Sequence, residues 1–589
     1  MTRFYSTIFQ HRAWLVMALL ILFVGAVRLR LRDMPLERDE GEYAYSGQLI
    51  LQGIPPYKLA YNLKLPGVYA AYALMMLLFG QTAAGIHLGL LVVNAASIIL
   101  MFFLGRRLLD LNGGLVAAAT FALLSLSVSV LGLAAHASHF VVLAALGGTL
   151  LLLRVTGARA FPSAATSGRE GASGSTQIRG CSEVAADRNV RAPGCFASGA
   201  LFGVAFLMKQ PGVFWGIFGL FYLAWGEFHG PRDLSKERRS ANRRLAASGA
   251  EWKTGLVRCA WYCLGMVTPF LLMCLALMVA GVFDRFVFWT FTYAREYVSV
   301  HPLLRIPNEE LQQSFRAVFG PNLPLWLLAV LGAVLMWWDN RLQDRRLFIG
   351  GFCAVSLMAV CPGWYFRQHY FVFLLPAAGL LAGIAVNRGI YLLRHDRTIE
   401  LFLAVPILGL FAVGLAAALI GNGSVWFEMS PAAASRESFQ RQMFPEDAEL
   451  GEYLKAHAAP DARIAVLGSE PEIYFYARRH SATGYIYTYP LMELHKYALK
   501  MQEEMIREIE AARPQYLIFV KVDESWLLRP ESDRKILDWY EQYSKMNYDL
   551  VRVIKEPDDE TTKVDPLVPD RTPGLLLLYE RKRFAAQTP

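Results

Sequence analysis

The chain has 589 residues, of which 55% are hydrophobic and only 18% are charged. About a quarter of the residues of a soluble globular protein are charged, so this composition indicates a protein that has lipid as part of its solvent. The net charge of +9 comes largely from basic residues in short connections between apolar segments. That placement predicts membrane topology and argues against a basic nucleic-acid-binding face.

Apolar segments recur up to about residue 425, most of them near the 17–25 residues with which a helix crosses a bilayer. About eleven spans are predicted, and the fifth and sixth are short and share a break at Lys209–Gly212. The predicted fold is therefore an α-helical polytopic membrane domain over residues 1–425. The segments are 13–31, 84–104, 114–133, 137–153, 196–208, 212–226, 257–282, 322–338, 347–361, 370–387 and 399–421.

Basic pairs such as Arg106–Arg107, Arg238–Arg239 and Arg345–Arg346 fall on one side of this map, which the positive-inside rule assigns to the cytoplasm. The arginines at 28, 30 and 32 oppose this orientation locally. With the N-terminus inside and an odd number of spans, the C-terminal region lies outside. We expect a multi-pass protein of the plasma (inner) membrane with an extracytoplasmic C-terminal domain.

Residues 32–83 form the first long outer loop, which contains the run Arg38-Asp39-Glu40-Gly41-Glu42-Tyr43. If a helix begins there, Asp39, Glu42 and Tyr43 lie on one face. Acidic residues at a helix N-terminus are also ordinary capping residues, so capping and catalysis are both open from this segment alone. The apolar stretch Pro66–Phe79 is too short for a comfortable span and predicts an interfacial or re-entrant helix.

Cations occur at a similar depth on the same predicted side. They are Lys64 at the start of that apolar stretch, Lys209 at the helix break, and Arg367 close to His369. A lone lysine at a membrane boundary is usually a snorkelling anchor. Several cations together with a cluster of carboxylates favour another interpretation, in which an anionic lipid head group lies beside a reacting centre.

Two further regions differ in composition from the apolar segments. Residues 155–194 are rich in Ser, Ala and Gly without periodicity, which predicts a disordered cytoplasmic insertion. Residues 430–589 contain strand-like runs at Ala462–Leu467, Tyr516–Val520 and Leu575–Tyr579, with a helical pattern over Leu491–Ala511. They predict a small soluble α/β domain.

The first loop resembles that of the GT-C fold glycosyltransferases, above all the glycosyltransferase 39-like group of protein O-mannosyltransferases and aminoarabinose lipid A transferases. Asp39, Glu40, Tyr43 and Lys64 match the Asp-Glu pair, the tyrosine and the lysine of its pattern, and Leu65 replaces the first of two prolines. Further matches are Phe206–Lys209 and the stretch from Arg367 to Pro376. The likeness covers roughly residues 10–390.

This resemblance implies transfer of a sugar from a polyprenyl-phosphate donor to the hydroxyl of a lipid, glycan or protein acceptor, with inversion. It implies Asp39 as general base with Glu40 beside it in the catalytic group. Glu40 and Glu42 would orient the acceptor or a metal; no cofactor is certain, and a divalent cation stays open. The predicted substrate-binding residues are Glu42, Tyr43, Lys64, Lys209, Arg367, His369 and His139.

One departure leaves the acceptor open, because the segment Ala135–Phe140, with His136 and His139, stands where the family often has an acidic residue. Two other classes of protein are alternatives. A lipid or glycan transporter or flippase would show internal repeats and charges near mid-membrane, and neither is evident in the sequence. An assembly scaffold would explain the outer domain but not the clustered carboxylates and cations.

Overall fold

The computed structural model describes residues 2–156, 181–229, 241–299, 308–394, 398–440, 442–556 and 574–582. The chain divides into two compact units, each of which is made from separate stretches of sequence. The first, the helical unit, comprises Met1–Val27, Leu90–Leu275 and Arg305–Ser424. The second, the outer-loop unit, comprises Arg28–Gly89, Ala276–Leu304 and Val425–Pro589. The first predicted outer loop thus belongs with the C-terminal region.

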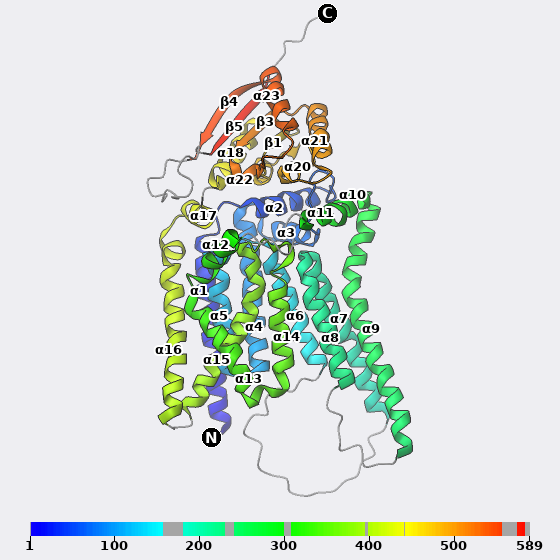
Figure 1. Cartoon of the computed structure of the whole chain (residues 1–589), viewed down its shortest axis with the longest axis vertical. Helices are drawn as coiled ribbons and strands as arrows, with labels where there is room; N and C mark the ends of the chain where they lie inside the picture. Colours follow the sequence, from blue (N-terminus) through cyan, green and yellow to red (C-terminus); the bar gives the residue numbers. More distant parts are fainter. Residues whose placement is uncertain are drawn as a thin grey trace, which may run out of the picture. The chain divides into compact units, whose positions relative to one another are not determined.

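The helical unit consists mainly of long apolar helices (Figure 1). Its helices are α1 (Thr2–Arg30), α4 (Ala83–Leu108), α5 (Leu111–Leu126), α6 (Ala137–Val155), α7 (Cys181–Met208), α8 (Val213–His229), α9 (Ala241–Val279), α12 (Asn308–Phe319), α13 (Leu323–Trp338), α14 (Arg346–Met358), α15 (Leu375–Leu393) and α16 (Thr398–Gly421).

The core of this unit lies around α15, which packs against α5, α13 and α16. Gly379 and Gly383 have the spacing that allows close approach between apolar helices. A methyl group on Gly383 would lie 2.7 Å from the carbonyl oxygen of Gly113 in α5, so the two backbones are in direct contact. Buried side chains from all four helices close this core: Val116, Leu328, Ala382, Ala385, Val386 and Ile407.

The multi-pass prediction is confirmed, because each of the eleven predicted segments coincides with a helix. Among the described residues, six helices are long and apolar enough to span a membrane, or seven if the bent pair Leu311–Phe319 and Leu323–Trp338 counts as one span. Several others are apolar but shorter. The predicted segment 114–133 is interrupted, because α5 ends at Leu126 and Ser127 has an extended backbone.

The predicted disordered insertion at 155–194 lies in part, at 157–180, outside the described residues. From Cys181 onward the prediction of disorder is wrong, because α7 already begins there. Extending an existing helix requires far less free energy than nucleating one. The helix that the apolar segment forms from near residue 196 therefore extends towards the N-terminus into the polar sequence.

The outer-loop unit combines helices of the first outer loop with a five-stranded sheet (Figure 1). The strands are β1 (Arg463–Leu467), β2 (His480–Ser481), β3 (Tyr516–Lys521), β4 (Tyr548–Lys555) and β5 (Leu575–Arg581), in the order β2-β1-β3-β5-β4. β1 runs parallel to β2 and β3, whereas β5 is antiparallel to β3 and β4. The α/β prediction is confirmed, although β2 and β4 were not foreseen.

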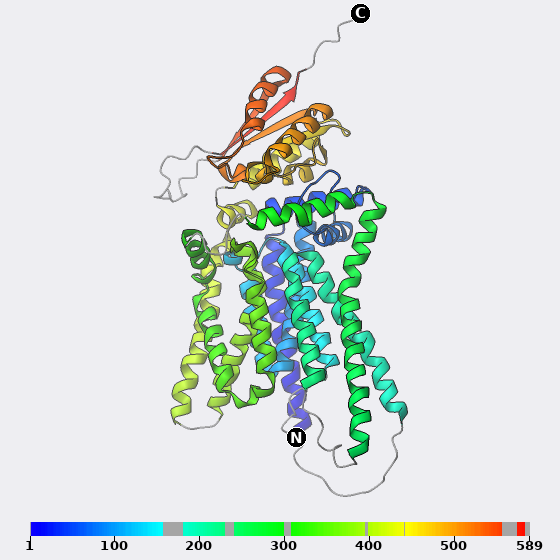
Figure 2. The ribbon, with the colours of Figure 1, turned by 45° about the vertical axis from the view of Figure 1, so that its right-hand side comes forward.

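The outer-loop unit also contains helices, some of which lie beside the sheet in the rotated view of Figure 2. The predicted helix over 491–511 is instead two helices, α20 and α21, because Glu493–Tyr497 leave the helical path. The helices are α2 (Arg38–Leu51), α3 (Gly67–Phe79), α10 (Phe283–Val287), α11 (Ala294–Ser299), α17 (Pro431–Phe439), α18 (Phe444–His457), α19 (Glu472–Ala477), α20 (Tyr489–Met492), α21 (Ala498–Ala512), α22 (Asp523–Trp526) and α23 (Lys535–Asn547).

Candidate functional site

The predicted helix in the first outer loop is present as α2, and its N-terminus has a complete capping box. The Glu37 carboxylate accepts from the backbone N–H of Glu40 at 2.9 Å, and the Glu40 carboxylate accepts from the N–H of Glu37 at 3.3 Å. These bonds satisfy backbone donors that the first turn of a helix otherwise leaves unpaired. Glu37 and Glu40 therefore cap the helix, and the side chain of Asp39 takes no part in this capping box.

The carboxylates of Asp39 and Glu42, both on α2, converge on the ammonium group of Lys64. Lys64 lies in the loop between α2 and α3. The Lys64 Nζ lies 2.6 Å from Asp39 Oδ1 and 2.6 Å from Glu42 Oε2. Tyr69, at the start of α3, donates its hydroxyl to Glu42 Oε1 at 2.5 Å. The Glu42 side chain is fully buried, whereas Asp39 and Lys64 retain 18% and 21% of their exposure. Asp39 is thus the carboxylate of this pair that solvent or a substrate can reach.

The electrostatics of this group are dominated by burial and by the opposed charges. Burial raises the pKa of Glu42, although Lys64 acts against this shift. Burial alone would lower the pKa of Lys64, but Asp39 and Glu42 outweigh it and the pKa of the ammonium is raised. Lys64 therefore stays charged between the two carboxylates.

Aromatic rings complete the surroundings of Lys64. Its ammonium lies 4.6 Å from the centre of the Tyr43 ring and 5.6 Å from that of Tyr487. Such contacts between a cation and an aromatic face are attractive. The Tyr487 hydroxyl also donates to the carbonyl oxygen of Arg38 at 3.0 Å. Sequence analysis missed Tyr487, because nothing in the C-terminal sequence indicates that it contacts residues some four hundred positions earlier.

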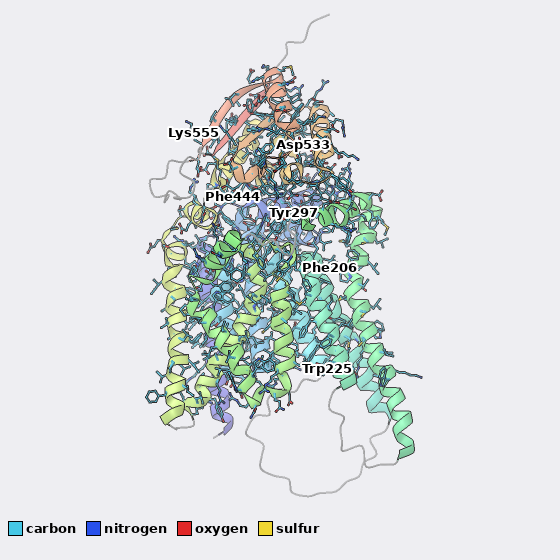
Figure 3. The ribbon with its side chains drawn as sticks, viewed as in Figure 1. Phe206, Trp225, Tyr297, Phe444, Asp533 and Lys555 are labelled. Atoms are coloured by element: carbon cyan, nitrogen blue, oxygen red, sulfur yellow. The ribbon has the colours of Figure 1, made fainter. Side chains whose placement is uncertain are left out.

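Arg38, next to Asp39, connects α2 to the C-terminal sequence. Its guanidinium donates to the carbonyl oxygen of Ser469 at 2.5 Å and to Glu470 at 2.9 Å. The same group lies 5.8 Å from the ring of Phe444, which Figure 3 labels. A planar guanidinium with several fixed donors holds its position better than a flexible ammonium would. Arg38 therefore holds the start of α2 against the C-terminal sequence, and Lys64 holds the carboxylate of Asp39.

Glu40, the second acid of the predicted catalytic group, is fully buried away from Lys64. Its Oε1 lies 3.1 Å from Nε2 of His87, whose Nδ1 lies 2.7 Å from the carbonyl oxygen of Arg32. Because a carbonyl only accepts, Nδ1 must carry a proton. Nε2 therefore shares one further proton with Glu40. This geometry gives Glu40 a supporting position, and its predicted catalytic role stays a prediction.

The remaining predicted residues belong to the helical unit. Lys209 lies over the ring of Tyr370, with its Nζ 4.2 Å from the ring centroid. Tyr370 directly follows His369 in the sequence. The His369 ring stacks on that of His136 with centroids 4.2 Å apart. Arg367 is exposed and lies over Tyr365, and His139 is buried in α6. The structure thus brings Lys209 near the segment of Arg367 and His369, while the substrate-binding roles remain predictions.

Comparisons with known proteins show which fold the chain has. No family model matches the chain, and no curated protein matches it. The chain nevertheless has the GT-C fold of polytopic membrane proteins, as its likeness to a solved structure over nearly the whole length shows. The resemblance predicted this fold, and the prediction is confirmed.

The solved structure is that of ArnT from Cupriavidus metallidurans bound to undecaprenyl phosphate, with a TM-score of 0.51 and 16% sequence identity. The match covers 96% of this chain and 98% of ArnT. The oligosaccharyltransferase of Archaeoglobus fulgidus in its apo form matches with a TM-score of 0.48 and 12% identity, over 86% of this chain and 69% of the other.

Proposed function

We propose that the chain is a membrane glycosyltransferase that moves a sugar from a polyprenyl-phosphate donor to an acceptor hydroxyl on the extracytoplasmic side of the plasma (inner) membrane. The observation that carries this proposal is the partly exposed Asp39 held by Lys64 at the start of α2. The presence of undecaprenyl phosphate in the structure of ArnT supports the class of donor.

In the proposed reaction, Asp39 accepts the proton of the acceptor hydroxyl while the oxygen attacks the anomeric carbon. The bond from that carbon to the phosphate oxygen breaks on the opposite face, which inverts the configuration. The polyprenyl phosphate leaves as an anion, so the site needs positive charge there more than it needs a general acid.

Lys64 supplies that charge in the proposal. An ammonium group has three N–H donors, of which Asp39 and Glu42 take two. A phosphate oxygen of the donor would take the third. Lys64 would then hold the base and the leaving group close together. Lys209, Arg367, His369 and His139 remain proposed substrate-binding residues, and Glu40 with Glu42 would support this arrangement.

The test is Asp39→Asn, which keeps the size of the side chain but removes the base. Because the capping residues of α2 are Glu37 and Glu40, the variant should fold, insert and bind donor. We expect its turnover to fall by about 10²–10⁴, the typical contribution of a positioned base. Sugar transfer from a lipid-linked donor in proteoliposomes measures this directly.

Asp33→Asn is the matched control, since Asp33 is an exposed carboxylate of the same loop that pairs with Arg32. It should leave turnover unchanged. Near-normal turnover of Asp39→Asn would remove the proposed base. A wild-type protein that moves the intact donor across the bilayer without sugar transfer would instead favour a flippase.

A further inference from the structure

The C-terminal ends of α2 and α3 enclose a shallow hollow in the outer-loop unit. Its volume is about 500 Å³. Its lining combines apolar and polar residues with one arginine. The lining residues are Leu51, Met76, Leu77, Gly80, Gln81 and Arg478. None of them takes part in the group around Lys64.

The apolar lining continues along the outside of α3. Leu74, Leu77 and Leu78 are 55%, 69% and 65% exposed, and their spacing places them on one face of the helix. α3 has no charged residue over its 13 positions. A contiguous exposed apolar face of this kind marks a contact with lipid or protein. A chain with several membrane-spanning helices lies next to lipid, so acyl chains are available to bury such a face.

Arg478 occupies a backbone position at which glycine would be favoured. It follows the last residue of α19 with φ 52° and ψ 41°, in the left-handed region. A side chain other than glycine is disfavoured there. The sequence nevertheless has an exposed arginine, whose guanidinium donates a long hydrogen bond of 3.4 Å to the carbonyl oxygen of Gln81. A guanidinium has five N–H donors, and Arg478 lines the hollow, so an anionic group bound there could accept from it.

Another arginine lies beside the edge strand β2, which follows Arg478 in sequence. Arg463 pairs with His480 in the register of β1 and β2, and it contributes, after burial, to lowering the pKa of that histidine. His480 in turn hydrogen-bonds Gln52 at the end of α2, at 2.7 Å. An apolar helix face with an arginine at its end suits an anionic lipid head group and its acyl chains.

We propose that this hollow binds the phosphate of an anionic bilayer phospholipid, with Arg478 on the phosphate and the acyl chains along Leu74, Leu77 and Leu78. This goes beyond the proposed transferase function and does not depend on it. The simpler interpretation is that Arg478 only neutralises the carbonyl ends of α2, α3 and α19, which a cation also favours. That interpretation predicts no dependence on anionic lipid.

The test compares Arg478→Gly with wild type in the full-length protein, purified in neutral detergent. Thermal unfolding is followed while phosphatidylglycerol or phosphatidylcholine is added, because a ligand that binds the folded state raises the midpoint. We expect Arg478→Gly to be at least as stable as wild type without lipid, since glycine suits the backbone. It should need about tenfold more phosphatidylglycerol for half-maximal stabilisation, the usual loss with a charge-assisted contact.

Arg513→Gly is the matched control. Arg513 is also exposed and follows a helix, α21, with φ 47° and ψ 59°, but it is not part of the hollow. It should respond to phosphatidylglycerol as wild type does, and Arg478→Lys should keep most of the response. An unchanged response of Arg478→Gly would overturn the proposal. So would equal stabilisation of wild type by inorganic phosphate, which would make the ligand a free anion.

Discussion

Lys64 shows how a residue that looks like a membrane anchor in sequence acquires a different environment in the fold. A snorkelling lysine would point its ammonium towards water, but here Nζ contacts Asp39 and Glu42 and faces the ring of Tyr43. Glu42 has no exposed side-chain area, so its charge depends on that ammonium. Lys64 therefore stabilises the unit in addition to its proposed role towards the donor.

Lys64→Met should separate these roles. Removing one partner from a buried ion pair typically destabilises a protein by about 3–5 kcal/mol, because the other charge remains buried. We expect a lower free energy of unfolding and weaker donor binding. In the double variant Lys64→Met/Glu42→Gln the buried charge is gone, so stability should largely return while donor binding stays weak. Donor affinity equal to that of wild type in the double variant would show that Lys64 is a structural partner alone.

At the scale of elements, α2 is placed by its contact with α19. A methyl group on Gly41 would lie 2.6 Å from the backbone nitrogen of Glu472, so the two helices touch through backbone atoms at this point. Glu472 and Asp447 are both buried there, and their carboxylates interact. Burial and the nearby Glu470 raise the pKa of Glu472 to about 8, although Arg38 acts against the shift. Burial and Glu472 likewise raise the pKa of Asp447.

This pair predicts a pH dependence of stability. The folded protein keeps a proton on Glu472 at pH values where the unfolded chain has lost it. The stabilisation is therefore fully present below the ordinary pKa of 4.5 and is lost as the pH rises to about 8. Glu472→Gln is neutral throughout, so its thermal midpoint should fall less than that of wild type over this range. Glu503→Gln, at an exposed carboxylate, should keep the wild-type slope, and an unchanged slope in Glu472→Gln would contradict the assignment.

At the scale of the whole molecule, the basic connections predict the side of the membrane on which each region lies. Reporter fusions at Ser240 and Lys500 should report opposite compartments, with Ser240 in the cytoplasm, because loops rich in Lys and Arg are retained there. A fusion at Pro56, in the first outer loop, should agree with Lys500. If Ser240 and Lys500 report the same compartment, the predicted orientation is wrong, and with it the proposed extracytoplasmic reaction.

The sequence by itself determined the helical class, the positions of the apolar helices and the start of α2. These features depend on local patterns, namely the length of apolar runs and the chemistry of a helix N-terminus. It also singled out Asp39, Glu42 and Lys64, which the structure brings within hydrogen-bonding distance. The α/β character of the C-terminal region was equally readable from its three strand-like runs.

Only the tertiary structure decided which acids cap and which meet Lys64, because one turn of α2 presents Glu40 and Glu42 to different neighbours. Likewise, it joined the first outer loop to the C-terminal region through Arg38 and Tyr487. Such contacts link residues hundreds of positions apart and leave no period in the sequence. β4 escaped prediction for a related reason, since it is an edge strand whose residues are mostly exposed, so no buried run marks it.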